Sequence, residues 1–224
     1  MQAIQKQKYP VRRAPVAVAN PMQKLQDLAA QILADSLGRS RYTVAIAGPP
    51  ASGKSTLTQE LAGLIAPHTS VAVVAMDGFH FDNNILCQRN RLQYKGAPDT
   101  FDVTGFRLLL ERLMHQATEI AVPVFDRVLD VSRACAQIIS PSDHVVLIEG
   151  NYLLVQIPPW DIPKEYFDLS VFLGPPIDVL EERLVDRWLK HDHTQAEAVE
   201  RAHRNDLPNA RYVLDHSRVA DIVL

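Results

Sequence analysis

Five short apolar runs recur along the chain at intervals long enough to hold a helix between them. The runs are rich in Val, Ile, Leu and Ala, and their apolar character is nearly continuous. Such runs are typical of strands that are buried on both faces of a parallel sheet. The runs that we predict as strands are Tyr42 to Ala47, Val71 to Met76, Val145 to Ile148, Leu169 to Leu173 and Val219 to Leu224.

Helical segments fill the gaps between these runs. The first helix is expected to start at Asn20-Pro21, where an N-cap residue precedes a proline, and to end at Gly38. Thr194 and Glu197 have the spacing of a capping box, which predicts the start of a late helix. The alternation predicts a doubly wound, mainly parallel five-stranded α/β sheet with ligands beyond the carboxyl ends of its strands. The other predicted helices are Lys54 to Ala66, Thr104 to Gln116 and Ile177 to His191.

The segment Gly48-Pro-Pro-Ala-Ser-Gly53-Lys54-Ser55 joins the first predicted strand to a helix. This is the pattern of a phosphate-binding loop, in which backbone N–H groups face an anion and the lysine reaches the outer phosphates. Ser55 offers a hydroxyl to magnesium. The alternative is a glycine-rich turn that holds no ligand. The residues that we expect to bind nucleotide are Gly48, Ala51, Ser52, Gly53, Lys54, Ser55 and Thr56.

Two carboxylates follow predicted strands and therefore lie on the same rim of the sheet as the loop. Asp77 follows the second strand and is placed to accept a proton from a substrate hydroxyl during phosphoryl transfer. The alternatives for Asp77 are an Asx-turn or a remote magnesium ligand. Glu149 ends the strand that starts at Val145, where a carboxylate binds magnesium directly or through water. A plain strand-to-loop turn is the alternative for Glu149.

Several cationic side chains are candidates for the same site. Arg183 and Arg187 are four residues apart and share one face of a helix, where they either clamp the transferred phosphoryl group as part of a mobile lid or pair with nearby acids in solvent. His80 is placed for substrate contact or for local packing. The cluster His191-Asp192-His193 is more typical of a polar loop than of a metal site.

Composition limits the class of protein. A chain of 224 residues with 47% apolar content is expected to form one domain, and a formal charge of −3 with no basic patch argues against a nucleic-acid partner. Cys87 and Cys135 lack metal or disulfide spacing, which indicates reduced thiols in the cytoplasm. No apolar run reaches the length of a membrane span. Residues 1–20 are basic, and a disordered tail is favoured there over a transit peptide.

Taken together, these segments resemble the P-loop family that includes phosphoribulokinase, uridine kinase and type I pantothenate kinase. The chain is most similar to the kinases associated with fructose transport or described as pantothenate-kinase-like, which share an ending like Asn205 to Ala210. The resemblance implies ATP and Mg²⁺ as cofactors, Asp77 as catalytic base and Arg187 as a lid arginine within residues 183–205. It also implies that Lys54 and Ser55 serve ATP and magnesium and that Glu149 serves the metal or substrate site. The segments that carry the resemblance are Gly48 to Ser55, Asp77 to His80, Lys95 to Asp102, Val122 to Asp126, Ile148 to Gly150 and Asp186 to Lys190.

Two positions depart from the named families. Phe125 and Arg127 stand where pantothenate kinases have a tyrosine and a histidine, and Phe125 also replaces the tyrosine of uridine kinases. Arg127 is expected either to meet an anionic group of the acceptor or to form a salt bridge with Asp126 or Asp130. The residues that we expect to contact the acceptor are His80, Lys95, Asp102, Phe125, Arg127 and Arg183.

The sequence therefore predicts an ATP-dependent kinase whose domain covers residues 21–224 and which phosphorylates a hydroxyl of a small metabolite. A sugar or sugar-like acceptor is preferred, followed by a nucleoside and then pantothenate. A regulatory NTP-binding switch is the non-enzymatic alternative, but the chain lacks the Asn-Lys-x-Asp motif that reads guanine. The sequence does not determine the oligomeric state, and a homodimer is one arrangement that it allows.

Overall fold

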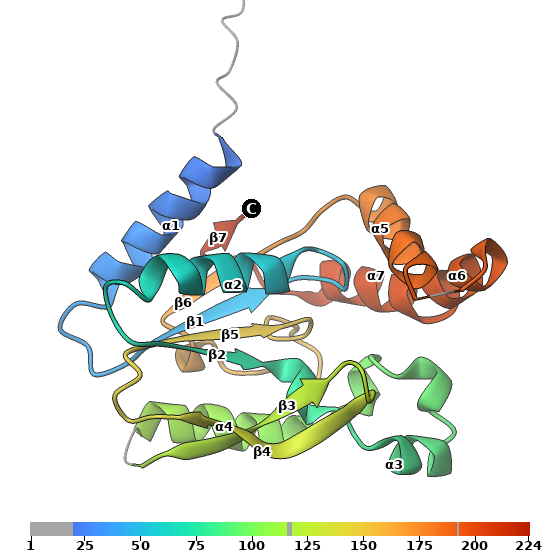
Figure 1. The fold of residues 1–224 in the computed structure, drawn as a ribbon, viewed down its shortest axis with the longest axis horizontal. Coiled ribbons are helices and arrows are strands. Elements are labelled where there is room, and N and C mark those ends of the chain that lie inside the picture. The colour runs from blue at the N-terminus through green and yellow to red at the C-terminus, as the bar shows by residue number, and fades with distance from the viewer. Residues whose placement is uncertain (1–19, 116–117, 192) are drawn as a thin grey trace, which may run out of the picture.

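The central element is a parallel β-sheet, seen in a computed structural model that describes residues 20–115, 118–191 and 193–224 (Figure 1). In these residues the sheet has five strands in the order β2-β5-β1-β6-β7, and every neighbouring pair is parallel. The predicted α/β class and parallel sheet are confirmed. The strands are β1 (Tyr42–Ala47), β2 (Val71–Ala75), β5 (Val145–Gly150), β6 (Leu169–Phe172) and β7 (Ile222–Val223).

Helices cover both faces of the sheet. Helices α1 (Pro21–Asp35) and α2 (Lys54–Ile65) lie over one face, and α4 (Val103–His115) lies against the other (Figure 1). Along β1, Val44 and Ile46 belong to the core beneath α1 and α2, whereas Ala45 and Ala47 belong to the opposite core. Because successive side chains of a strand point to opposite faces, a strand between two helical layers needs apolar residues at every position.

Capping residues start the helices where the sequence predicts them. The Asn20 side chain accepts a hydrogen bond from the backbone N–H of Met22, and the capping box of Thr194 and Glu197 starts α6 (Gln195–Arg201). Helix α1 ends at Asp35 rather than Gly38, and α5 (Ile177–Leu189) ends two residues before His191. The predicted tail and the end of one predicted helix, Gln116, fall on residues 1–19 and 116–117, outside the described residues.

An antiparallel hairpin, which the sequence analysis did not predict, packs at the edge of the sheet. It consists of β3 (Ile120–Asp126) and β4 (Val131–Ile139), and its register shifts between Val122 and Val124. The hairpin lies against the 3₁₀ turn that follows β2, Met76–Phe79. The side-chain nitrogen of Gln137 donates to the carbonyl of Val73, 2.9 Å away, which ties β4 to the free edge of β2. The tip of the hairpin lies near the carboxyl end of β2, where Arg127 is 3.5 Å from Asp77.

The C-terminal helices gather beyond the carboxyl ends of the strands (Figure 1). Helix α6 passes through a π-helical turn, Ala202–Asp206, into α7 (Leu207–His216), which was also not predicted. None of the helices in the described ranges is both long and apolar enough to cross a bilayer. The remaining short elements are α3 (Asn83–Gln88) and the 3₁₀ turns Leu92–Tyr94, Pro98–Thr100 and Lys164–Tyr166.

Gly78 permits the close approach of the hairpin to the end of β2. A Cβ atom at this position would overlap the carbonyl group of Pro123 in β3. We expect Gly78→Ala to lower the free energy of unfolding by about 1–3 kcal/mol, because the hairpin must move to relieve the overlap. Urea denaturation followed by circular dichroism measures this change.

The matched control is Gly63→Ala on the exposed side of α2. Among the described atoms, nothing lies within 4 Å of a Cβ at Gly63, and alanine favours a helix over glycine. This variant should raise the free energy of unfolding by about 0.5–1 kcal/mol. Equal stability of Gly78→Ala and the wild-type protein would show that the hairpin does not depend on this contact.

Candidate active site

The phosphate loop, residues 48–55, connects β1 to α2 and borders a cavity of about 450 Å³, which we call the loop cavity. Gly53 has φ +98° and precedes the first residue of α2, and Ala51 also has a positive φ of 61°. These left-handed conformations curl the backbone so that the start of α2 faces the cavity. The expected nucleotide-binding residues that line the loop cavity are Ala51, Gly53, Lys54, Ser55 and Thr56.

Gly48 and Ser52 are also expected nucleotide-binding residues, but they are not among the described residues that line the loop cavity. Ser52 is buried, and its hydroxyl has no hydrogen-bond partner among the described residues. A Cβ at Gly48 would come within 2.8 Å of that hydroxyl and 2.5 Å of the Leu173 carbonyl. Glycine at this position therefore lets the loop backbone pack against the end of β6.

Glu149 and Ser55 meet at the carboxyl end of the sheet. The Ser55 hydroxyl lies 3.0 Å from both carboxylate oxygens of Glu149 and donates to them. Burial raises the pKa of Glu149, and the nearby charge of Lys54 opposes that rise. A hydroxyl and a carboxylate beside a phosphate site are the hard oxygen donors that Mg²⁺ prefers, with the other positions filled by water and phosphate.

A magnesium site of this kind needs few protein ligands. Within residues 20–115, 118–191 and 193–224, no group of three His, Cys, Asp or Glu side chains is arranged to hold a metal. That includes the loop containing His191 and His193, where His193 instead lies 3.2 Å from a guanidinium nitrogen of Arg201. Residue 192 lies outside the described ranges. The Ser55 hydroxyl and the Glu149 carboxylate are donors that would suit Mg²⁺ bound together with a nucleotide.

Asp77 lies in the 3₁₀ turn after β2, and its carboxylate faces Arg127. The shortest distance between the two charged groups is 3.5 Å. The backbone N–H of His80 closes the turn by donating to the Asp77 backbone carbonyl, 3.2 Å away, so this bond does not support the Asx-turn alternative, which needs the carboxylate as acceptor. Arg127 comes from the hairpin tip, and this pairing was not anticipated by the sequence analysis. The salt-bridge alternatives for Arg127 are wrong, because Asp126 pairs with Arg133 and Asp130 pairs with Lys95.

A second cavity of about 520 Å³ opens between the hairpin and the C-terminal helices, and we call it the hairpin cavity. Its wall includes His80, Lys95, Phe125 and Arg127, four of the six residues expected to contact an acceptor. The two cavities meet at a shared wall, defined by the residues that line both of them. The shared wall consists of Pro50, Asp77, Arg127, Asn151 and Arg187.

His80 is held between two aromatic rings in this cavity. The centroids of Phe101 and Phe125 lie 4.0 Å and 4.8 Å from that of the imidazole, and Nδ1 lies 2.8 Å from the Asp77 carbonyl. Burial lowers the pKa of His80, although the nearby Asp77 carboxylate opposes the shift. His80 therefore stays neutral at neutral pH, and an Nδ1–H that donates to the carbonyl leaves Nε2 as an acceptor. His80 therefore packs against neighbouring rings and also lines the hairpin cavity.

Lys95 is anchored before any ligand is bound. Its ammonium nitrogen lies 2.7 Å from the side-chain oxygen of Asn83 and 3.1 Å from the carboxylate of Asp130. It also lies 4.9 Å from the centroid of the Phe125 ring. The ammonium group of Lys95 thus links α3 to the hairpin, and its charge is already partly balanced.

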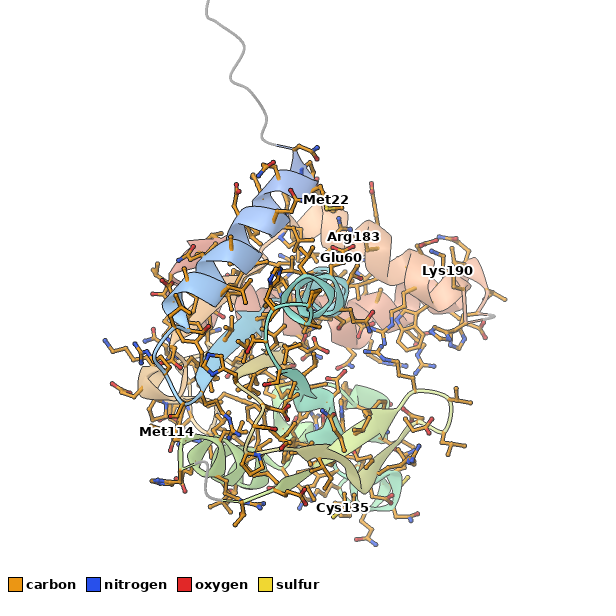
Figure 2. The ribbon with its side chains drawn as sticks, turned by 60° about the vertical axis from the view of Figure 1, so that its left-hand side comes forward. Met22, Glu60, Met114, Cys135, Arg183 and Lys190 are labelled. Carbon is orange, nitrogen blue, oxygen red and sulfur yellow. The ribbon has the colours of Figure 1, made fainter. Side chains whose placement is uncertain are left out.

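The other two expected acceptor residues lie elsewhere. Asp102 is exposed and accepts a hydrogen bond from the backbone N–H of Gly105 at the start of α4. Arg183, labelled above α2 in Figure 2, donates to the carbonyls of Ala51 and Ser52 in the phosphate loop, each 3.3 Å away. Within the described structure, neither residue lines the loop cavity or the hairpin cavity. Arg183 therefore contacts the phosphate loop from α5 rather than pairing with nearby acids.

The C-terminal helices close the far side of the hairpin cavity around Trp188. The indole nitrogen of Trp188 donates to Asp206, 2.6 Å away, and the guanidinium of Arg201 stacks on the ring at 4.1 Å. Burial raises the pKa of Asp206, whereas the bond from Trp188 opposes that rise. Arg187, on the same helix as Trp188, reaches the shared wall. Figure 2 shows Lys190 at the outer end of the C-terminal helices, and Lys190 is not among the described residues that line either cavity.

Sequence reasoning missed several residues that line these cavities. Asn151 follows Glu149 and Gly150 directly, and its place after a strand was a signal that could have identified it. Asn205 and Asp206 belong to the π-helical turn, a feature that is often found at functional sites but has no clear sequence pattern. The cavity residues that were missed include Asn83, Gln93, Asn151, Trp188, Arg201, Asn205, Asp206 and Asn209.

Comparison with known proteins agrees with this architecture. The model of the "Phosphoribulokinase / Uridine kinase family" matches residues 43–224. A crystal structure described as a "putative fructose transport system kinase" from Silicibacter sp. TM1040 is 42% identical, with a TM-score of 0.84, over 89% of this chain and 98% of that one.

Two curated relatives are similar over shorter alignments. A Schizosaccharomyces pombe protein named "Putative uridine kinase C227.14" is 32% identical over 83% of each chain. A pantothenate kinase from Myxococcus xanthus is 31% identical over 72% of this chain but only 54% of its own length. With a family match that extends from the first strand to the last residue, the chain belongs to the phosphoribulokinase/uridine kinase family of P-loop kinases.

Proposed function

We propose that this protein transfers the γ-phosphoryl group of ATP to a hydroxyl group of a small polar metabolite. The observation that carries the proposal is the shared wall, where Asp77, Arg127 and Arg187 border both the loop cavity and the hairpin cavity. A nucleotide in the loop cavity and an acceptor in the hairpin cavity would meet at this wall. In-line transfer requires this kind of contact between the two substrates.

The loop side is suited to ATP and magnesium. Lys54 is placed for the outer phosphates, and Ser55 with Glu149 would hold Mg²⁺. The metal, when bound, supplies positive charge to the phosphate oxygens. Arg187 adds a guanidinium at the shared wall, where charge spreads over the transferred group. We infer that residues 183–205 act as the lid of one kinase domain covering residues 21–224.

Asp77 is the proposed general base. Its carboxylate would accept the hydroxyl proton as the acceptor oxygen forms its bond to phosphorus. The contact with Arg127 holds the carboxylate at the shared wall. The alternative role for Asp77 is that of a remote magnesium ligand. The variant Asp77→Asn distinguishes the two roles, because loss of a magnesium ligand would weaken nucleotide binding, whereas loss of a base would not.

A sugar or sugar-like molecule is the acceptor class that we prefer. Neutral His80 offers Nε2 as an acceptor, and Gln93 and Asn209 also line the hairpin cavity. Asn205 lines it too, but its amide already bonds to the Lys95 carbonyl and to Asn209. Neutral donors and acceptors of this kind suit a ligand with several hydroxyl groups. The name of the Silicibacter structure, which mentions fructose transport, supports the same class.

A nucleoside is the nearest rival, followed by pantothenate. The name of the Schizosaccharomyces pombe relative supports a nucleoside. Against it, the Phe125 ring already contacts His80 and the ammonium of Lys95, which limits the ring surface left for stacking on a base. Pantothenate is disfavoured because Phe125 and Arg127 replace the tyrosine and histidine expected of its kinases.

The proposal is tested by ADP release with ATP, Mg²⁺ and separate panels of sugars, nucleosides and pantothenate. We expect turnover with sugars. With the active acceptor, Asp77→Asn should lower kcat by about 10²–10⁴-fold while ATP still binds, because only proton transfer is lost. Asp99→Asn is the control, since Asp99 is exposed and pairs with Arg91 outside both cavities. Turnover with nucleosides alone would exclude the sugar class, and an unchanged kcat in Asp77→Asn would exclude the base.

The buried carboxylate of Glu149 predicts a conflict between stability and metal binding. Its pKa is raised in the folded protein, so the carboxyl group favours folding below the ordinary pKa of glutamate, about 4.3, and this contribution is lost as the pH rises through the higher folded pKa. Without nucleotide, Glu149→Gln should therefore unfold at higher urea than the wild-type protein at pH 8. The difference should shrink toward pH 4.

The same variant should weaken magnesium-dependent activity, because an amide oxygen carries no charge. We expect the apparent magnesium affinity to fall by about 10–100-fold. Magnesium titrations of ADP release, together with urea denaturation at both pH values, measure the two effects. A variant that is less stable than the wild-type protein at pH 8 would contradict the account of Glu149.

A further inference from the structure

Asn151 occupies the position between the two reacting groups of the proposed kinase. It directly follows β5, and β5 lies between β1 and β2 in the sheet. Gly150 pairs with Ala47, the residue before the phosphate loop, and Glu149 pairs with Ala75, two residues before Asp77. The chain therefore leaves β5 between the loop and Asp77, and Asn151 is part of the shared wall.

The side chain of Asn151 is buried without a partner. The residue is 9% exposed, and its side-chain oxygen has no contact with solvent and accepts no hydrogen bond in the described part of the chain. The side-chain nitrogen is not among the buried unpaired atoms, and we take it as the end of the amide that is available to a ligand. Because Asn151 lines both cavities, a ligand held where the cavities meet would come within reach of its side-chain amide.

Several buried polar side chains in or beside the sheet are satisfied by the protein itself, although the hydroxyls of Ser52 and Ser217 have no partner among the described residues. Thr43 donates to the carbonyl of Tyr166, 2.9 Å away, and Ser170 donates to Asp221, 2.6 Å away. Arg41 donates to three backbone carbonyls. The unpaired side-chain oxygen of Asn151 costs free energy of folding that no described protein contact offsets, so packing alone does not account for an asparagine at this position.

We propose that Asn151 is a further catalytic residue, whose amide nitrogen donates a hydrogen bond to an oxygen of the γ-phosphoryl group during transfer. This assignment rests on the proposed kinase function. In that step the acceptor oxygen bonds to phosphorus, the bond from phosphorus to the β–γ bridging oxygen breaks, and ADP leaves with the electron pair. The hydroxyl proton goes to Asp77. A fixed neutral donor stabilises the charge on the equatorial oxygens without adding charge to the site.

The test compares the binding of Mg·ADP alone with the binding of Mg·ADP and aluminium fluoride, which mimics the phosphoryl group in transfer. For Asn151→Ala, calorimetry should give an unchanged affinity for Mg·ADP and an affinity for the fluoride complex lowered at least about tenfold. Asn151→Asp keeps the shape of the side chain but replaces the donor by a carboxylate, so its loss should be greater. With an active acceptor, kcat of Asn151→Ala should fall by about 10²-fold with little change in the acceptor KM.

Ser170→Ala is the matched control. Ser170 is also 9% exposed and lies in β6, away from both cavities, so this variant should lose stability but keep fluoride-complex affinity and kcat. Unchanged fluoride-complex affinity in both Asn151 variants, whatever their melting temperatures, would overturn the assignment while leaving the kinase function in place. A wild-type protein that gains no affinity from aluminium fluoride would overturn both the assignment and the proposed function.

Discussion

The parallel pairing of β1, β5 and β2 is the constraint on which the site depends. Their register places the residues after three strands at one rim: the phosphate loop after β1, Glu149 and Asn151 at the end of β5, and Asp77 after β2. A shift of one residue in β5 would turn Glu149 to the opposite face of the sheet. Because apolar residues on both faces of these strands enter two separate cores, the packing that stabilises the fold also sets the spacing of the chemical groups.

The site concentrates charges that the fold does not fully compensate. Burial raises the pKa of Glu149, Asp77 is held by an exposed arginine from a separate hairpin, and the Asn151 amide has no described partner. Each of these features is unfavourable or weak in the protein alone. In the function that we propose, Mg²⁺, phosphate oxygens and an acceptor hydroxyl would compensate for each of them, which is the arrangement expected of a site that is complementary to a reacting complex.

The sheet and its rim were predictable because their signals are local. Continuous apolar runs indicated the five strands, and the loop with Asp77 and Glu149 followed from strand ends.

The hairpin was not predictable, because much of β4 is exposed and Arg133 to Ala136 show no alternation of apolar and polar residues. Its curvature brings Arg127 to Asp77, a contact between segments that only tertiary packing determines. Helix α7 was missed for a related reason, since it continues from a π-helical turn without a side-chain cap. Asp102 matched the family pattern, but in the structure its side chain accepts a hydrogen bond from the backbone N–H of Gly105 at the start of α4.

The central claim is that the loop cavity and the hairpin cavity meet where the phosphoryl group is transferred. A crystal structure with Mg²⁺ and a non-hydrolysable ATP analogue tests it most directly. The account predicts that the γ-phosphorus lies at the shared wall, with the Asp77 carboxylate facing it across a space for one hydroxyl group. A γ-phosphate that points away from Asp77, or a loop cavity closed off from the hairpin cavity in the complex, would contradict it.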